Sequence, residues 1–174
     1  MPKELNDNIC EDAVFERIYN KYAQDLQDYL HYKYGEQYNP ADKAQEALIK
    51  LWDNCKNVTF SKAKSFLFTV ASNMMLNEIK HQKVVLRYHQ EKPKDYTNES
   101  PEFILEKEEF LQRYQKILGN LNEEQRVAFL LNKVEGKKHS EIAELLGVTQ
   151  KVVEYRIYSA FNTLKKELEG FKLK

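Results

Sequence analysis

The strongest constraint on the fold is a segment near the C-terminus, HSEIAELLGVTQKVVEYRIYSAFNTL, residues 139–164. A short helical pattern before Gly147 is followed by a longer one with a single apolar stripe, which is typical of a helix-turn-helix. Gly147 adopts a left-handed turn at little cost, and Ala143 is small enough for the two helices to cross closely. The stripe predicted to be buried consists of Val153, Ile157, Ala160, Phe161 and Leu164.

The second helix of such a motif enters the major groove of DNA with its N-terminal residues leading. The residues that this helix is predicted to turn toward DNA are Gln150, Lys151, Glu154, Tyr155 and Tyr158, with Arg156 on the flank toward the DNA backbone. Each has a structural alternative: Glu154 could pair with Lys151, and the tyrosines could cover a neighbouring apolar edge. Two exposed tyrosines on one helix nevertheless favour a binding surface.

Capping residues predict where the helices around this motif begin and end. Asn122, with Gln125 three residues later, predicts a helix start, and Gly136 its end. Ser140 and Thr149 are predicted to cap the two helices of the motif. The buried stripe of the preceding helix is expected to be Val127, Leu130, Leu131 and Val134.

The N-terminal half begins with a helix whose apolar stripe includes Val14, Ile18 and Leu26. The pair Asn39–Pro40 predicts a second helix from about Ala41. The face predicted to be buried consists of Ala44, Ala47, Leu48 and Leu51, and the opposite, carboxylate-rich face consists of Asp42, Gln45, Glu46, Ile49 and Asp53. We expect Trp52, at the border between them, to anchor the core.

A third helix is predicted over residues 63–81, and apolar residues cover most of its circumference. Its polar stripe consists of Thr69, Asn73, Asn77 and Lys80, and Lys83 and Arg87 extend the basic character beyond it. Spacing alone leaves two interpretations open. The stripe could be the solvent-exposed edge of a core helix, or it could offer amides and ammonium groups to bases and phosphates.

The polar segment YHQEKPKDYTNESP predicts a linker at residues 88–101 between domains at 8–87 and 102–170. Few glycines and prolines, together with many helix-forming residues, favour an all-α fold of two small helical domains, the C-terminal one a helix-turn-helix. The formal net charge is zero, but acidic residues predominate in the first part of each half and basic residues in the second. Each half is therefore expected to touch two kinds of surface.

Several function classes are not favoured by the sequence. No apolar run is long enough for a signal peptide or a membrane span, so we expect a cytoplasmic protein with no membrane insertion. Cys10 and Cys55 lack zinc-ligand spacing and are expected to be reduced. With dispersed histidines and no GxxxxGK[ST], GxSxG or HExxH motif, we expect no enzyme, metal or cofactor.

These segments resemble the extracytoplasmic-function class of bacterial sigma factors over residues 12–168. The segment ADKAQEALIKLW is similar to the acidic helix of that class, through Asp42, Gln45 and Glu46. SFLFTVASNMMLNEIKHQ is similar to its hydrophobic helix, centred on residues 71–73. LNEEQRVAFLLNKVEGKKHSEIAELLGVT is similar to its second domain.

The resemblance implies a sigma factor that directs core RNA polymerase to promoters and helps to melt them. Asp42, Gln45, Glu46 and Asp53 would then bind polymerase. The hydrophobic helix and the loop after it would capture a flipped base of the minus-ten element, using Asn73, Asn77, Lys80 and Lys83. The helix carrying Gln150, Lys151, Glu154, Tyr155, Arg156 and Tyr158 would read the minus-thirty-five element. Many members also bind an anti-sigma factor, for which the linker leaves room.

The sequence departs from the family at four positions, two of them among these residues. Asn77 replaces a usual aspartate and Lys80 a usual arginine, while Val152 and Ser159 stand where threonine and arginine are frequent. A lysine binds phosphate as a point charge rather than a fork. Two other interpretations remain: a free-standing regulator with a sensing or dimerisation domain, and an assembly protein that uses the motif for protein contacts. The neutral net charge argues against unaided DNA binding by the former.

Overall fold

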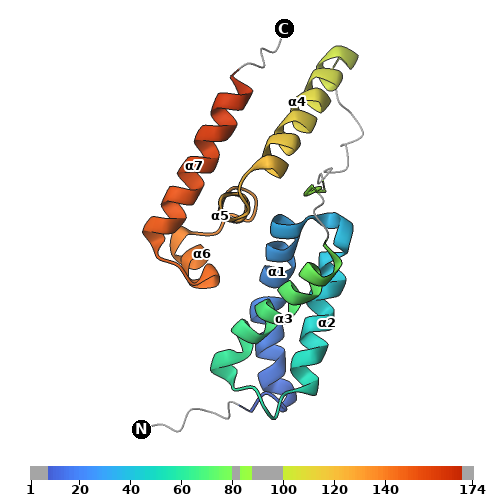
Figure 1. Ribbon diagram of the computed structural model, residues 1–174, viewed down its shortest axis with the longest axis vertical. Helices are drawn as coiled ribbons and strands as arrows, with labels where there is room; N and C mark the ends of the chain where they lie inside the picture. The colour runs from blue at the N-terminus through green and yellow to red at the C-terminus, as the bar shows by residue number, and fades with distance from the viewer. Residues whose placement is uncertain (1–7, 80–82, 88–99, 170–174) are drawn as a thin grey trace. The chain divides into compact units, whose positions relative to one another are not determined.

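The computed structural model of the chain describes residues 8–79, 83–87 and 100–169. Within these ranges the fold is helical and contains no strand, which confirms the all-α prediction (Figure 1). The chain divides into two compact units, Met1–Gln82 and Lys83–Lys174. Over the described ranges, none of the helices has the length and apolar character needed to cross a membrane.

The N-terminal unit contains helices α1 (Asp12–Tyr34), α2 (Pro40–Asp53) and α3 (Ala63–Glu78). Short 3-10 turns precede the last two, η1 (Glu36–Tyr38) and η2 (Phe60–Lys62). Asn39 takes the left-handed conformation, with φ of 50°, and Pro40 occupies the first turn of α2, where its missing N–H costs nothing. The three helices share one core, which includes Ile18, Leu26, Leu30, Ala44, Ala47, Leu48, Leu51, Leu67, Ala71 and Met75.

Helix α3 ends at Glu78, three residues before the predicted end. Ile79 is extended, with φ and ψ of −84° and 116°, and its side chain packs against the core of the unit. The helix therefore ends at the point where the Ile79 side chain packs against the core. Only the row at spacing four, Ala63, Leu67, Ala71 and Met75, is fully buried.

Two predictions for this unit are wrong. Cys10 and Cys55 form a disulfide, with their Cα atoms 5.1 Å apart, although they were expected to be reduced. The fold brings the turn before α1 against the turn after α2, a proximity that separation in sequence hides. Trp52 is 39% exposed and lies outside the core, with the centre of its ring 5.0 Å from the centre of the Phe15 ring in an edge-on arrangement.

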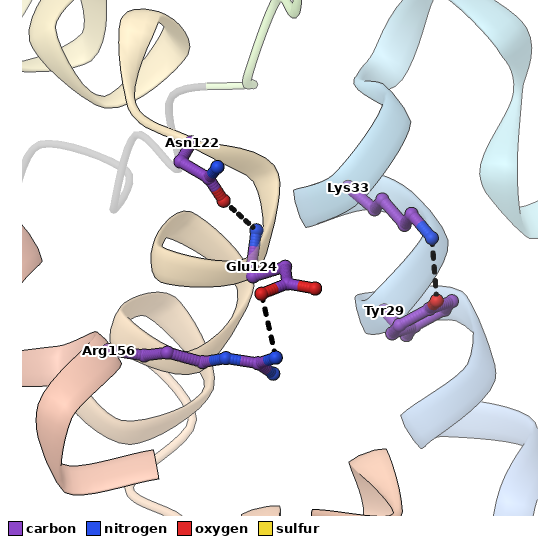
Figure 2. A network of polar contacts seen from close by, with 5 residues as sticks. All are labelled: Tyr29, Lys33, Asn122, Glu124 and Arg156. Atoms are coloured by element: carbon purple, nitrogen blue, oxygen red, sulfur yellow. Dashed lines mark hydrogen bonds and ion pairs between the residues drawn. The ribbon is translucent and has the colours of Figure 1, made fainter. Parts of the chain in front are cut away.

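The last turns of α1 hold a partly buried ammonium group. The Nζ atom of Lys33 donates a hydrogen bond of 3.0 Å to the hydroxyl of Tyr29 (Figure 2). The same atom lies 5.2 Å from the centre of the Tyr34 ring. Burial lowers the pKa of Lys33, but the hydrogen bond and the neighbouring tyrosines raise it to a net value above its ordinary one. The helix thus ends on a positive charge, which its dipole favours.

The C-terminal unit contains α4 (Pro101–Asn120), α5 (Glu123–Lys133), α6 (His139–Leu146) and α7 (Gln150–Leu168). As predicted, the side chains of Asn122 and Thr149 cap α5 and α7 by accepting backbone N–H groups. The predicted cap at Ser140 is wrong: α6 starts at His139, and the Glu141 carboxylate accepts the N–H of Lys138 at 2.7 Å.

Gly147 ends α6 with φ of 68°, and Gly136 adopts the same φ after α5. Both are therefore left-handed glycines of the kind predicted from sequence. At Gly147 this conformation lets the N–H of Val148 reach the carbonyl of Ala143, at 3.0 Å, before α7 begins.

The core of this unit lies between α5, α6 and α7. Val153, Ile157, Ala160 and Leu164 of α7 are buried as predicted, but Phe161 is 50% exposed, and Val134, past the end of α5, is 52% exposed. The buried stripe of α7 is therefore narrower than its sequence pattern indicates, whereas α5 is buried at every position over residues 126–131, more than the predicted stripe. A side chain one position off the central row of a helix lies on its flank.

Arg126 is the one charged side chain that is fully buried within the described residues, at 1% exposure. Its guanidinium donates hydrogen bonds to the carbonyls of Leu121, at 2.8 Å, and Gly119, at 3.4 Å. Burial lowers the pKa of Arg126 more than the nearby Glu123 raises it, so the net pKa lies below its ordinary value. The Arg126 side chain thus supplies hydrogen-bond donors to the backbone carbonyls between α4 and α5 from inside the unit.

Candidate polymerase and nucleic-acid interfaces

The acidic face of α2, defined as Asp42, Gln45, Glu46, Ile49 and Asp53, is exposed along its whole length. The opposite side of the helix is buried in the three-helix core. Ile49 is 60% exposed, and Trp52 extends the apolar surface beside it. The face therefore combines carboxylates with an apolar centre, a composition suited to a protein partner with basic groups. The sequence placed Ile49 on this face but missed Trp52.

Lys43 fixes one end of the acidic face. Its Nζ atom lies 2.6 Å from a carboxylate oxygen of Glu78 and 3.8 Å from one of Glu46, so it joins α2 to the last turn of α3. The hydrogen bond to Glu78 raises the pKa of Lys43 more than burial lowers it. Since Glu46 keeps about half of its side chain in solvent, it can still reach a partner.

The predicted minus-ten residues are only partly brought together. Asn73 and Asn77 are exposed on the same side of α3, with Thr69 one turn before Asn73. Lys80 lies outside the described residues. Lys83 follows the end of α3 and belongs to the C-terminal unit, so it does not continue the stripe on this helix.

A cavity of about 680 Å³ opens beside the first half of α3. It lies against the segment before this helix, whereas the family resemblance implied a role for the loop after it. Its lining residues are Asn54, Asn57, Val58, Lys62, Ser65, Phe66, Thr69 and Val70. Asn73 is not among them. The polar run NCKNVTFSK between two apolar helices was the available sequence signal for this cavity.

The predicted DNA face of α7 is open to solvent. Tyr155 and Tyr158 are 68% and 66% exposed, and Gln150, Lys151 and Glu154 are exposed on the same part of the helix. A carboxylate oxygen of Glu154 lies 3.7 Å from the Nδ1 atom of His139 on α6. The residues that line a cavity of about 660 Å³ on this face include Lys151, Glu154, Tyr155, Tyr158 and the exposed Phe161.

Arg156 has a partner within its own unit. Its Nη2 atom donates to a carboxylate oxygen of Glu124 at 2.7 Å, and Asn122 accepts the backbone N–H of Glu124 at 2.9 Å (Figure 2). The Arg156 side chain is only 15% exposed, whereas that of Glu124 is 66% exposed. The pair therefore ties α7 to the start of α5 and turns the guanidinium toward protein.

The helices and surfaces described above define a class of protein. Residues 18–84 match the family described as Sigma-70 region 2, and residues 111–164 match Sigma-70, region 4. The N-terminal match includes the acidic face and the polar stripe of α3, and the C-terminal match includes the helix-turn-helix. The chain belongs to the sigma-70 family, in its extracytoplasmic-function class.

Individual relatives agree with this assignment. The chain is 30% identical to the ferric citrate uptake sigma factor FecI of Escherichia coli (strain K12) over 139 residues, which cover 78% of this chain and 80% of FecI. It also resembles the structure of sigma factor RpoE from Bartonella quintana, solved with the anti-sigma factor NepR. That match has a TM-score of 0.56 and 19% identity, and it covers 91% of this chain and 98% of RpoE, which establishes a shared fold.

Family membership settles the main function predicted from sequence. The protein is a sigma factor, which directs core RNA polymerase to promoters and assists promoter melting, and its partners are core polymerase and promoter DNA. A free-standing regulator is not favoured, because its N-terminal half would be a sensing or dimerisation domain and not the Sigma-70 region 2 that residues 18–84 match.

Proposed function

We propose that the two units divide promoter recognition, with polymerase and minus-ten contacts on the N-terminal unit and minus-thirty-five contacts on the C-terminal unit. The observation that carries this proposal is the exposed acidic face of α2, because the opposite side of the helix is buried in the core. Carboxylates around the exposed Ile49 would meet a basic, partly apolar surface of the polymerase. Asp42, Gln45, Glu46 and Asp53 would supply the polar contacts.

The test is a charge reversal with a matched control. Asp42→Arg together with Glu46→Arg should reduce core-polymerase binding by more than about tenfold, because two charges in one interface turn repulsive. Glu108→Arg together with Glu109→Arg on α4 makes the same change in net charge at exposed positions of the other unit. Equal affinity for the two double variants in a binding titration would count against the acidic face as the dock.

For the minus-ten element we propose that α3 and the segment before it bind unpaired DNA. The cavity of about 680 Å³ is large enough for one base, and Phe66 offers it an apolar wall. Asn73 and Asn77, exposed on the same helix, would hydrogen-bond to neighbouring bases or phosphates. Lys80 and Lys83 would add charge along the strand.

For the minus-thirty-five element we propose that α7 enters the major groove through Gln150, Lys151, Glu154, Tyr155 and Tyr158. Their exposure and the cap at Thr149 support this orientation. Lys151→Ala and Tyr155→Ala should change which promoters the holoenzyme uses. A loss that is uniform across promoter sequences would assign them to phosphate contacts instead.

We further propose that the protein works in the cytoplasm, without catalysis, cofactor or metal of its own. The predicted limits of its domains, 8–87 and 102–170 with a linker at 88–101, can be tested by limited proteolysis. The relative from Bartonella quintana, solved with an anti-sigma factor, supports a partner of this kind here. Exposed apolar residues in the first turns of α4, among them Phe103 and Leu105, offer such a partner a surface.

A further inference from the structure

The Cys10–Cys55 disulfide lies next to the cavity beside α3. Cys55 sits in the turn after α2, between Asn54 and Asn57, and both of these neighbours line the cavity. The sequence contains two cysteines, so within this chain each has the other as its only possible partner. Both are partly exposed to solvent, which leaves the bond accessible to small reagents.

The other end of the bond is firmly placed. Ile9 is completely buried in the core of the N-terminal unit, and it immediately precedes Cys10. The backbone N–H of Cys10 donates to the side-chain oxygen of Asn8 at 3.2 Å, and the N–H of Glu11 donates to the carbonyl of Asn8 at 3.0 Å. Cys55 is thus attached to a segment that Ile9 anchors in the core of the unit.

The disulfide adds to contacts that already hold the start of the segment between α2 and α3. The N–H of Cys55 donates to the carbonyl of Trp52 at 3.1 Å, and Val58 packs against the core of the unit. The turn of this segment is closed by the N–H of Asn57 on the carbonyl of Asn54 at 2.9 Å, and its far end is held at Phe60, whose ring lies 5.3 Å from the Arg17 guanidinium. We expect these contacts to keep the three-helix fold when the disulfide is reduced. The bond adds a tie where the segment forms the wall of the cavity.

We propose that Cys10 and Cys55 form a reversible redox site that controls the cavity wall, and hence the engagement of single-stranded promoter DNA. This inference rests on the proposed role of the cavity. Disulfides in a reducing compartment are mostly transient or redox-sensing, because thiol systems there reduce them. The bonded state pre-orders residues 54–58, and the dithiol state releases them.

The chemistry needs only a low-molecular-weight disulfide as oxidant. The thiolate of one cysteine attacks the oxidant and displaces one small thiolate, giving a mixed disulfide. The thiolate of the second cysteine then attacks the protein sulfur of that bond and displaces the second small thiolate. Two protein thiols and one small disulfide become one protein disulfide and two small thiols, and dithiothreitol drives the reverse exchange.

The test compares full-length protein oxidised by glutathione disulfide with protein reduced by dithiothreitol. Cys10→Ser with Cys55→Ser serves as a control that neither reagent can change. Intact-mass spectrometry should show the loss of two hydrogens per chain on oxidation, without cross-linked dimers. Hydrogen exchange at residues 54–58 should slow in the oxidised wild type alone, while circular dichroism shows the same helix content in all samples.

The functional readout is open-complex formation by the holoenzyme, followed by permanganate footprinting. The oxidised wild type should open promoters about three to ten times more efficiently than the reduced protein, because it need not order the cavity wall on binding. The double variant should match the reduced protein under both conditions. Equal opening or equal exchange in the two states would overturn the redox site, and so would cross-linked dimers as the sole product. If no sample opens any promoter, the proposed function fails instead.

Discussion

The ion pair between Arg156 and Glu124 leads to a quantitative prediction about the recognition helix. At a separation of 2.7 Å, two unit charges attract by about 1.5 kcal/mol at the dielectric constant of water and by about 6 kcal/mol at an effective value of 20. Because Glu124 is 66% exposed, the lower value applies, and ordering the two side chains reduces it further. We expect a net coupling of about 0.5–1 kcal/mol.

A double-mutant cycle of Glu124→Gln, Arg156→Met and their combination isolates this coupling. The single tryptophan, Trp52, belongs to the N-terminal unit, so its fluorescence does not follow unfolding of the C-terminal one. Native-state hydrogen exchange of amides in α5 and α7 reports the relevant opening free energy. The coupling should shrink in 1 M salt, where the screening length falls to about 3 Å.

The same variants separate a structural role of Arg156 from a DNA-binding one. Glu124→Gln should leave promoter binding by the holoenzyme unchanged or slightly stronger, because it removes a negative charge next to the proposed DNA surface. A coupling below about 0.2 kcal/mol, with a large loss of promoter affinity in Arg156→Met, would refute the reasoning. Arg156 would then act on phosphate rather than on α5.

Three further changes test particular features of the structure. Gly147→Ala should destabilise the C-terminal unit by about 1–2 kcal/mol through its left-handed φ alone, since a Cβ there meets no atom within 4 Å. Gly147→Asn should cost less, because asparagine tolerates this conformation better. Unfolding midpoints of both variants equal to that of the wild type would contradict this. Arg126→Met should cost about 2–3 kcal/mol in a urea titration, because the carbonyls of Gly119 and Leu121 lose a buried donor, and an unchanged midpoint would show that water replaces it. Asn73→Ala should lower open-complex formation severalfold on a permanganate footprint yet spare minus-thirty-five duplex binding, whereas equal loss of both would indicate misfolding.

Features set by local sequence were predictable. The two faces of α2 follow from apolar residues recurring at helical spacing, and the starts of α5 and α7 follow from Asn122 and Thr149, whose side chains accept nearby N–H groups. The turn at Gly147 needs only a residue that tolerates positive φ. Each of these depends on a few neighbouring residues, which is why the sequence pattern suffices.

Features set by tertiary packing were not predictable. Cys10 and Cys55 are 45 positions apart, and only the packing of α1 against α2 brings them together. The partner of Arg156 lies 32 positions away on another helix, and the cavity beside α3 depends on how the preceding segment folds back. Phe161 and Val134 fit the apolar stripes by spacing, but about half of each residue is exposed to solvent. Periodicity identifies which face of a helix is apolar, but it does not show how much of that face the neighbouring helices cover.

We propose that this single chain gives core polymerase its promoter choice through surfaces on both units. The most direct measurement is run-off transcription by the purified protein with core RNA polymerase on a genomic fragment library, with sequencing of the transcript starts. We expect starts at a limited set of promoters that share both a minus-thirty-five and a minus-ten element. Starts no different from those of core polymerase alone, with unaided binding of the protein to duplex DNA, would contradict it.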